Sequence, residues 1–320
     1  RVGGGDFRFY FKDHHVISGN TLLTNSNEPS EGSITRGGAV SLRWDYRTKP
    51  FTATIFAEHY DKNFRMDTAF YQRTGISGIS CFLTRFYYPD PDKFLRMRRI
   101  SLITNAFYTK DNVTGLNDYY LNIGIVPTMK WNGWFRADLI FNGESWGGVT
   151  YQKRTYMFWC QNQMTRWLNY WMRIRKGDSI YYDDVDPFKG DYVNWENDIT
   201  LQPTDNFNQN FSYTYEKLEN PVTKTSQYEI NIFESRTTYQ FNEYFFIRAL
   251  LQYDSYREVV LSDMLASFTL IPGTVMHLGY GSLNEKLEWQ NNQWLNDSQY
   301  GKYYQTSQSL YFKMSYLFRY

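Results

Sequence analysis

The sequence contains one short pattern associated with a catalytic nucleophile, at Gly143-Glu144-Ser145-Trp146-Gly147. The G-x-S-x-G pattern works where a strand leads through a strained turn into a helix, which exposes the serine hydroxyl. The residues around Ser145 instead predict a loop between two strands, where glycine and serine are ordinary loop residues. We therefore assign no catalytic residue and expect that the protein is not an enzyme.

Histidines are the next candidates, because a hydrolase of this kind needs one beside its serine or acid. The chain has four, at positions 14, 15, 59 and 277. His277 falls on the polar side of a strand predicted over 274–280, which favours a water-facing role over a catalytic one. His14 and His15 lie in a predicted short turn, and the turn accounts for them without a bound metal.

An acidic run could supply oxygen ligands for Ca²⁺ from one predicted long loop. It consists of Asp183, Asp184, Asp186 and Asp191. The spacing does not match an EF-hand loop, and carboxylates in solvated loops are common. We favour solvated side chains, keep Asp183, Asp184 and Asp186 as the calcium alternative, and assign no metal or cofactor.

Aromatic residues gather in another predicted loop near the C-terminus. They are Trp289, Trp294, Tyr300, Tyr303 and Tyr304. Such rings could stack on a sugar or contact a partner, but they also suit the aromatic girdle at a membrane interface together with loop packing. The girdle interpretation is favoured, and the residue types alone leave both open.

All of these candidates lie in or beside segments whose apolar and polar residues alternate with a period of two. Successive side chains of a strand point to opposite faces, so each segment has one apolar and one polar surface. Many consecutive segments of this kind, without a helical period between them, predict an all-β chain. Clear examples are residues 40–46, 168–175, 211–216 and 309–320.

Strand length and composition separate the possible all-β folds. Segments such as 121–129 and 245–253 reach the roughly nine to eleven residues of a tilted membrane strand, whereas sandwich strands usually have about five or six. Aromatic residues make up 20% of the chain, as in barrels with interfacial girdles. No stretch approaches the roughly 18 apolar residues of a spanning helix. The mean hydropathy of −0.60 suits a barrel, because only alternate residues face lipid.

The prediction is one antiparallel transmembrane β-barrel domain over residues 1–320, integral to a bacterial outer membrane. Charges on the polar sides of the strands need water, which a barrel lumen supplies. The net charge of +1 gives no indication of a nucleic-acid partner. The residues predicted to face the lumen are Arg136, Asp138, Arg173, Arg248 and Asp254.

Short and long connections alternate along the chain, as in barrels with short periplasmic turns and long extracellular loops. Tight turns are predicted at 47–50, 130–133, 202–205, 240–243 and 271–274, and long loops at 25–35, 176–189 and 281–304. The count is about 17 strands, within a range of 16–18. Because bacterial barrels have even numbers of strands and the first strand begins almost at Arg1, we favour missing upstream strands or an N-terminal domain.

The last strand has the form that barrel-assembly machinery uses as a signal, with apolar residues on alternate positions and a final aromatic. These residues are Met314, Tyr316, Phe318 and Tyr320. An edge strand of this kind can be templated by the insertase and then seal against the first strand. The expected partners are therefore outer-membrane lipid, the assembly machinery during insertion, and other outer-membrane proteins. Cys81 and Cys160 are expected to be unpaired residues on strands.

The C-terminal third resembles an uncharacterised outer-membrane β-barrel family that usually follows an N-terminal domain like carbohydrate-binding family 9. The resemblance rests on residues 241–248 (FNEYFFIR), 272–275 (PGTV), 278–280 (LGY) and 310–319 (LYFKMSYLFR). Residues 4–7 and 72–75 are more loosely similar to earlier landmarks of that family. The carbohydrate-binding-like domain is absent from this chain, so the resemblance implies fold and location but no sugar binding and no catalytic residue.

Two functions fit these observations. The first is a porin-like channel or uptake barrel for small hydrophilic solutes, since about 16–18 strands enclose an aqueous bore and lumen charges set selectivity. The second is a non-transporting barrel that acts as an anchor or as a subunit of a larger outer-membrane complex, which the long loops also suit.

Overall fold

The computed structural model describes residues 1–28, 33–66, 73–163, 165–271, 273–290, 293–296 and 301–317. Its regular structure consists of antiparallel strands, 18 in the described residues, of which β17 has only four residues. This confirms the predicted count. Among the described residues, no helix is long and apolar enough to cross a membrane. The strands are β1 (Val2–Phe11), β2 (His15–Glu28), β3 (Ser33–Arg47), β4 (Phe51–Tyr60), β5 (Ile76–Tyr87), β6 (Met97–Asp111), β7 (Asn117–Met129), β8 (Gly133–Trp146), β9 (Val149–Gln163), β10 (Leu168–Tyr181), β11 (Phe188–Thr204), β12 (Phe207–Glu219), β13 (Ser226–Asn242), β14 (Phe245–Asp254), β15 (Val259–Ile271), β16 (Thr274–Gln290), β17 (Gln293–Asn296) and β18 (Lys302–Ser315).

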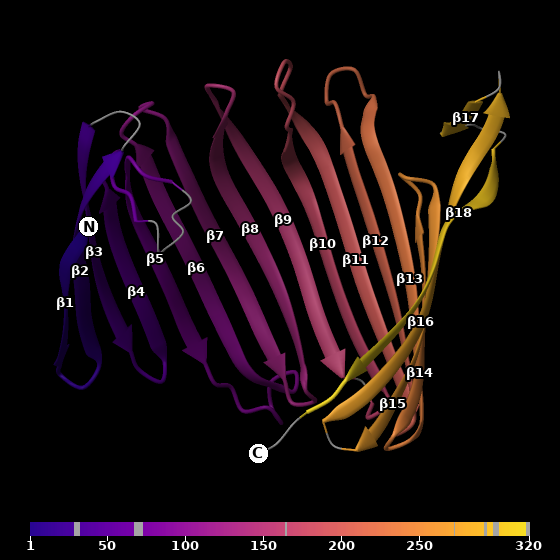
Figure 1. Cartoon of the computed structure of the whole chain (residues 1–320). Helices are drawn as coiled ribbons and strands as arrows, with labels where there is room; N and C mark the ends of the chain where they lie inside the picture. The colour runs from indigo at the N-terminus through magenta and orange to yellow at the C-terminus, as the bar shows by residue number, and fades with distance from the viewer. Residues whose placement is uncertain are drawn as a thin grey trace. The chain divides into compact units, whose positions relative to one another are not determined.

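The chain divides into two compact units. Unit one comprises residues 1–130, 134–158 and 177–190, and unit two comprises residues 131–133, 159–176 and 191–320. In unit one, each strand from β1 to β7 pairs antiparallel with the next strand in sequence, which brings the series to β8. In unit two the same holds from β11 to β16, after which β16 pairs with both the short β17 and the long β18 (Figure 1).

Strands of unit one present an apolar face and a polar face. On β7, Ile123 and Ile125 are 51% and 43% exposed, whereas Asn122 is 1% exposed. Ile123 lies opposite Leu139 of β8, and the next residue of β7 lies opposite Asp138. Paired residues therefore share a face, and the exposed face is the one that carries the branched apolar side chains. This confirms the period of two on which the fold prediction depends.

At the C-terminal edge of unit two, β18 is exposed along its whole length, and its two faces differ in residue type. Leu310 and Phe312 of β18 are 73% and 64% exposed, and Phe312 lies opposite Leu278 of β16. On the other face, Lys313 lies opposite His277. Met314 and Tyr316 are also exposed, although Tyr316 follows the end of β18. Phe318 and Tyr320, the other two residues of the predicted assembly signal, lie outside the described residues.

The predicted tight turns are confirmed. Four of them correspond to the links 48–50, 130–132, 205–206 and 243–244, and the fifth lies between Ile271 and Thr274, where residue 272 is outside the described part of the chain. Each of the five follows an odd-numbered strand. Because neighbouring strands are antiparallel, such links lie at one end of the sheet within each unit, which we call the turn end. The opposite end is the loop end. The link between β5 and β6, residues 88–96, also lies at the turn end but is longer than the others, and the sequence did not predict its length.

The predicted long loops are largely wrong. β16 continues to Gln290 and is followed by β17 and β18, while β10 continues to Tyr181 and leaves only residues 182–187 as a link. β2 and β3 likewise extend to Glu28 and from Ser33, and residues 29–32 lie outside the described part of the chain. These strands are longer than the roughly nine to eleven residues that a membrane requires. The strands therefore continue as paired hairpins beyond the length that a membrane requires. Their ends have the residue composition of loops, so the sequence did not indicate this.

The link after β4 folds over the polar face at the loop end of β2 and β3. The backbone N–H of Asp61 donates to the Gly38 carbonyl at 2.9 Å, and the Asp61 Oδ2 atom accepts the Gly38 N–H at 2.8 Å. The backbone of Phe64 lies directly over Gly37, so close that a Cβ atom on Gly37 would overlap it. The Phe64 side chain is only 4% exposed. Residues 61–66 are thus an integral part of the fold.

The contact at Gly37 gives a test of this packing. We expect Gly37→Ala to lower the free energy of unfolding by about 1–3 kcal/mol, the usual cost of overpacking, because the added Cβ must displace the backbone of residues 63 and 64. The matched control is Gly5→Ala on β1, where a Cβ would have open space. Urea unfolding of both variants in the same detergent measures the difference. Equal stability of the two variants would show that the link does not pack on β3.

Candidate functional site

The polar face of unit one carries the ion pair between Arg136 and Asp138 of β8. The guanidinium donates two hydrogen bonds to the carboxylate, at 2.6 and 2.9 Å, and Asn122 of β7 donates a third at 2.9 Å. The Asp138 side chain is fully buried, whereas that of Arg136 is 23% exposed. Gly124 lies opposite Asp138 and leaves the space that the carboxylate fills. The two residues predicted to face a lumen therefore form one unit, in which a buried carboxylate orients a partly exposed cation.

The same arrangement recurs on β3. Arg43 donates to both Asp45 oxygens at 2.7 and 3.0 Å, and the Thr54 hydroxyl of β4 donates to that carboxylate at 2.6 Å. The Arg43 side chain is 45% exposed, while that of Asp45 is 10% exposed. Residues i and i+2 of a strand share a face, so opposite charges at this spacing can pair without any partner strand. Sequence reasoning used the alternation but missed this pairing signal, which is visible in the R-x-D triplets.

Unit two places Arg173 in a pair that crosses strands. Its guanidinium donates to both oxygens of Glu196 on β11 at 2.7 Å. The neighbouring Arg175 donates to the Asn194 side-chain oxygen at 3.0 and 3.1 Å, and Asn194 is 1% exposed. The side chains of Arg173 and Glu196 remain 28% and 20% exposed. Charges on this polar face are therefore paired but not sealed from the adjoining space.

The last two predicted lumen residues lie on β14 and do not come together. Arg248 lies mid-strand, opposite Thr238 and Leu265. Asp254 is the final residue of the strand, and its Oδ1 atom accepts the backbone N–H groups of residues 256 and 257 at 2.9 and 3.1 Å. Its carboxylate therefore caps the link to β15, a use that the alternation did not indicate.

A recess of about 500 Å³ opens among the loop ends of β4 to β8, and we call it the acidic recess. Three carboxylates and one guanidinium line it, those of Glu58, Asp118, Glu144 and Arg73. Aromatic rings of Tyr60 and Phe107 complete much of its wall. It was not predicted, since its charges come from four separate segments of the chain.

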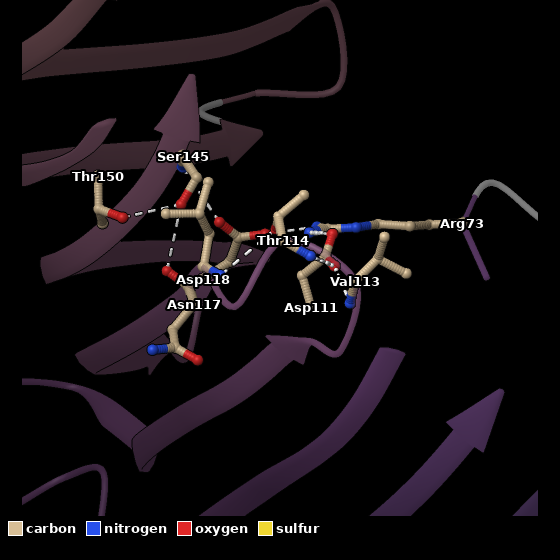
Figure 2. A network of polar contacts seen from close by, with 9 residues as sticks. Arg73, Asp111, Val113, Thr114, Asn117, Asp118, Ser145 and Thr150 are labelled. Carbon is tan, nitrogen blue, oxygen red and sulfur yellow. Dashed lines mark hydrogen bonds and ion pairs between the residues drawn. The ribbon is translucent and has the colours of Figure 1, made fainter. Parts of the chain in front are cut away.

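Arg73 connects the strands at this recess. It donates to Asp111 at 2.6 Å and to Asp118 at 2.7 Å, as Figure 2 shows. Asp111, the last residue of β6, also accepts the backbone N–H groups of Val113 and Thr114 at 2.7 and 2.8 Å. The Arg73 hydrogen bond, followed by those two N–H groups, holds the pKa of the Asp111 carboxyl well below its usual range. Asp111 is therefore ionised and orders both the link to β7 and the segment that carries Arg73.

Ser145 belongs to the same network and not to a catalytic turn. It lies within β8, and the Gly147–Gly148 turn that follows has positive φ at both residues and leads into another strand. The Ser145 N–H donates to Asp118 at 3.1 Å, and its hydroxyl contacts the Thr150 hydroxyl at 2.9 Å (Figure 2). The prediction of a loop is wrong at this point, because the hairpin extends further than its composition suggested. The helix that the catalytic pattern requires is replaced by β9.

The histidines have structural contacts of other kinds. His14 ends the turn between β1 and β2 as predicted, and His15, the first residue of β2, accepts a hydrogen bond from the indole of Trp44 at 3.2 Å. His59 contacts the Ser77 hydroxyl at 2.8 Å and Asp61 at 3.1 Å. His277 of β16 lies opposite Ser267 of β15.

The acidic run is divided between a turn and a strand. Asp183 accepts the backbone N–H groups of residues 185 and 186 at 2.8 and 3.0 Å, which places the pKa of its carboxyl below its usual value. Asp184 and Asp186 are exposed in the same link. Asp191 is part of β11 and not of a loop, and it lies 3.7 Å from Lys224. Within the described residues, no three or more acidic, histidine or cysteine side chains are grouped to hold a metal ion.

The remaining candidates are the C-terminal aromatics and the cysteines. Trp289 of β16 and Tyr303 and Tyr304 of β18 are exposed by 54%, 46% and 41%. Trp294 lies in β17, and Tyr300 lies outside the described residues. Cys81 on β5 and Cys160 on β9 are both unpaired, as predicted. These strands, rather than the predicted loop, carry most of the aromatic cluster.

Comparison with known proteins places the fold but no family. No family model and no curated protein matches the sequence, so the resemblance in the C-terminal third stays a prediction. A solved structure of a variant of the ferric enterobactin receptor PfeA from Pseudomonas aeruginosa is similar, with a TM-score of 0.55 and 8% identity. The match covers 98% of this chain and 61% of the receptor chain, so the present chain spans less than two thirds of the receptor's length.

A second solved structure, FpvAI in complex with pyocin S2, has a TM-score of 0.46 and 9% identity, with 98% of this chain and 58% of that chain covered. At such identities the likeness concerns the fold. Together with the antiparallel strands and their two faces, the PfeA match confirms the predicted class, an all-β antiparallel transmembrane β-barrel.

The Arg73 network predicts a dependence of stability on pH. An Asp whose pKa is depressed in the fold stabilises it above its unfolded pKa of about 3.9, and this contribution disappears as the pH falls toward the folded pKa. We therefore expect Asp111→Asn to lower the thermal unfolding midpoint at pH 7 and to have a smaller effect at pH 3. Thermal unfolding of both proteins in detergent at the two pH values measures this. An effect of the same size at both would contradict the network.

Proposed function

We propose that this chain is an integral β-barrel of a bacterial outer membrane and that it conducts small hydrophilic solutes as a channel or uptake barrel. The fold class is that of outer-membrane receptors, and the exposed branched and aromatic side chains of the apolar face suit contact with lipid. No catalytic step is part of the proposal, because the contacts of Ser145 serve the strand ends.

The proposal rests on how the charges on the polar face are paired and how far they are exposed. Arg43, Arg136 and Arg173 are each held by a carboxylate less exposed than themselves. A sheet that only closed over a dry core would gain little from such pairs, since desolvating both charges costs several kcal/mol. Partly exposed pairs are favourable where water reaches them, as on the wall of an aqueous bore. Fixed cations on that wall would then select among passing ions.

The alternative is a non-transporting barrel that acts as an anchor or as a subunit of a larger complex. One observation favours it. Residues 61–66 fold over the polar face in unit one and are fixed there through Gly37 and Gly38. A segment in this position narrows the space beside the strands. The two readings differ in whether folded protein conducts ions.

Single-channel recording of the folded chain in a planar bilayer tests the proposal. We expect discrete conductance steps and, for Arg43→Gln, a shift of selectivity toward cations. A unit charge about 7 Å from a passing ion contributes roughly 0.6 kcal/mol in water, so the permeability ratio should change by up to about threefold. Asp45 keeps its hydrogen bond from Thr54 in this variant, which limits damage to the fold.

Lys110→Gln is the matched control. Lys110 is an exposed cation at the loop end of β6 and does not line the acidic recess, so its replacement should leave the selectivity unchanged. Folding is verified for each protein by the change in gel mobility on boiling. Silence from correctly folded wild-type protein would overturn the channel and favour the anchor or subunit. An equal selectivity shift in both variants would show that Arg43 does not line the path.

A further inference from the structure

A second recess, of about 460 Å³, lies at the loop end of unit one among β7 to β11. We call it the basic recess, because three cations and one carboxylate line it: Lys153, Arg154, Lys189 and Asp178. The rings of Phe141 and Tyr156 form its apolar wall. None of these residues takes part in the polar-face pairs described above for Arg43, Arg136 and Arg173.

Arg154 projects from the apolar face of β9. Residues 152, 154, 156 and 158 are exposed, whereas 153, 155 and 157 are half-buried. Tyr156 and Phe158 are 55% and 38% exposed, and Phe158 packs against Phe135 with ring centroids 6.4 Å apart. Arg154 therefore shares its face with rings that suit lipid, about 13 Å along the strand from Phe158 at 3.3 Å per residue.

A cation on the lipid side of a barrel is restricted to certain depths. Arginine there costs about 2–4 kcal/mol at the bilayer midplane and roughly 0–1 kcal/mol near an interface. β9 begins at the loop end, and Arg154 is the sixth of its fifteen residues. It therefore lies in the half of the strand nearer the interface, where the cost of a lipid-facing arginine is lower. Its guanidinium lies over the Phe141 ring, 5.3 Å from the centroid, so a cation–π contact holds the charge on this side of the sheet.

The other charges of the basic recess are partly committed. Lys153 turns to Glu144 at 2.5 Å and is only 10% exposed. Asp178 accepts the backbone N–H of Arg154 at 2.9 Å and lies 3.7 Å from Lys189. The Asp178 carboxylate thus takes the place of a backbone acceptor between β9 and β10. Beside it, Gly177 lies so close to the Arg154 carbonyl that a Cβ atom would not fit. The guanidinium of Arg154 lies on the Phe141 ring, and the side chain of Lys189 is 44% exposed beside Asp178, so both can still contact an anion.

We propose that the basic recess binds the phosphate group of a lipid in the outer leaflet, with Arg154 and Lys189 as its ligands. The planar guanidinium can donate two parallel hydrogen bonds to a phosphate, and the ammonium adds a point charge beside it. Phe141 and Tyr156 offer apolar contact to the sugar or glycerol part and the first methylenes of the lipid. The inference rests on the membrane placement given under the proposed function, but it does not require conduction.

Lipid binding by the full folded chain in neutral detergent tests this site. The probes are a bisphosphorylated glycolipid, the same glycolipid without phosphates, and inorganic phosphate alone, each titrated and followed by native mass spectrometry. We expect tight binding of the phosphorylated lipid only. Arg154→Gln combined with Lys189→Gln should weaken it by at least about tenfold, since each variant removes a charge-assisted hydrogen bond. Arg154→Lys should give an intermediate loss because it keeps the charge but not the fork.

Lys110→Gln again serves as the control, because Lys110 is an exposed cation outside the basic recess. It should leave lipid affinity unchanged within about twofold, a fraction of 1 kcal/mol. Equal binding of the phosphate-free lipid, comparable binding of free phosphate, or an unaffected double variant would each overturn the proposal. A chain that binds the lipid yet is silent in a planar bilayer would sink the channel and leave this site intact, so the two failures are distinguishable.

Discussion

Each strand of this protein carries two surfaces that must satisfy opposite environments at the same time, and the rest of the structure depends on this constraint. The apolar surface exposes residues such as Ile123 and Phe312, while the polar surface buries Asn122 and Asp138. A shift of register by one residue would exchange the two surfaces. Pairing charges within the polar surface, as Arg136 does with Asp138, offsets part of the penalty that an isolated buried charge would carry. Register and charge pairing therefore stabilise each other.

The alternation of side chains was visible in the sequence, and so were the tight turns, the strand count and the fold class. These features are local, because they depend on neighbouring residues within a strand or on a turn of a few residues. The ion pairs at i and i+2 were equally local and could have been predicted from the triplets around Arg43 and Arg136. They were missed because the charges were interpreted singly, as residues that need water.

Contacts between distant segments were not predictable in this way. Arg73 joins Asp111 and Asp118, which are 38 and 45 residues away, and no periodicity marks such a partner. The extended hairpins were missed for a related reason. Residues that resemble a loop in composition, such as those around Ser145, remain in strands because the opposite strand continues to offer hydrogen-bond partners. The G-x-S-x-G pattern therefore belongs to the end of a β-hairpin and not to a catalytic turn.

The two ends of the strands differ in what they contribute. The turn end consists mainly of short links, while the loop end of unit one contains the acidic recess on one side of β8 and the basic recess beside Arg154. Tyr119 lines both recesses. The acidic recess is lined mainly by carboxylates and the basic recess mainly by cations. Function on this fold is therefore expected at the strand ends as well as along the polar face.

The most direct test of the account is the accessibility of alternate residues on one central strand to water. Single cysteines would replace Ser212, Tyr213, Thr214 and Tyr215 of β12 in a protein whose own two cysteines are serines, reconstituted in vesicles. The account predicts that a charged, membrane-impermeant thiol reagent modifies positions 212 and 214 quickly and positions 213 and 215 slowly, because only the polar face meets water. Equal modification of all four positions, or faster modification of 213 and 215, would contradict the assignment of the two faces.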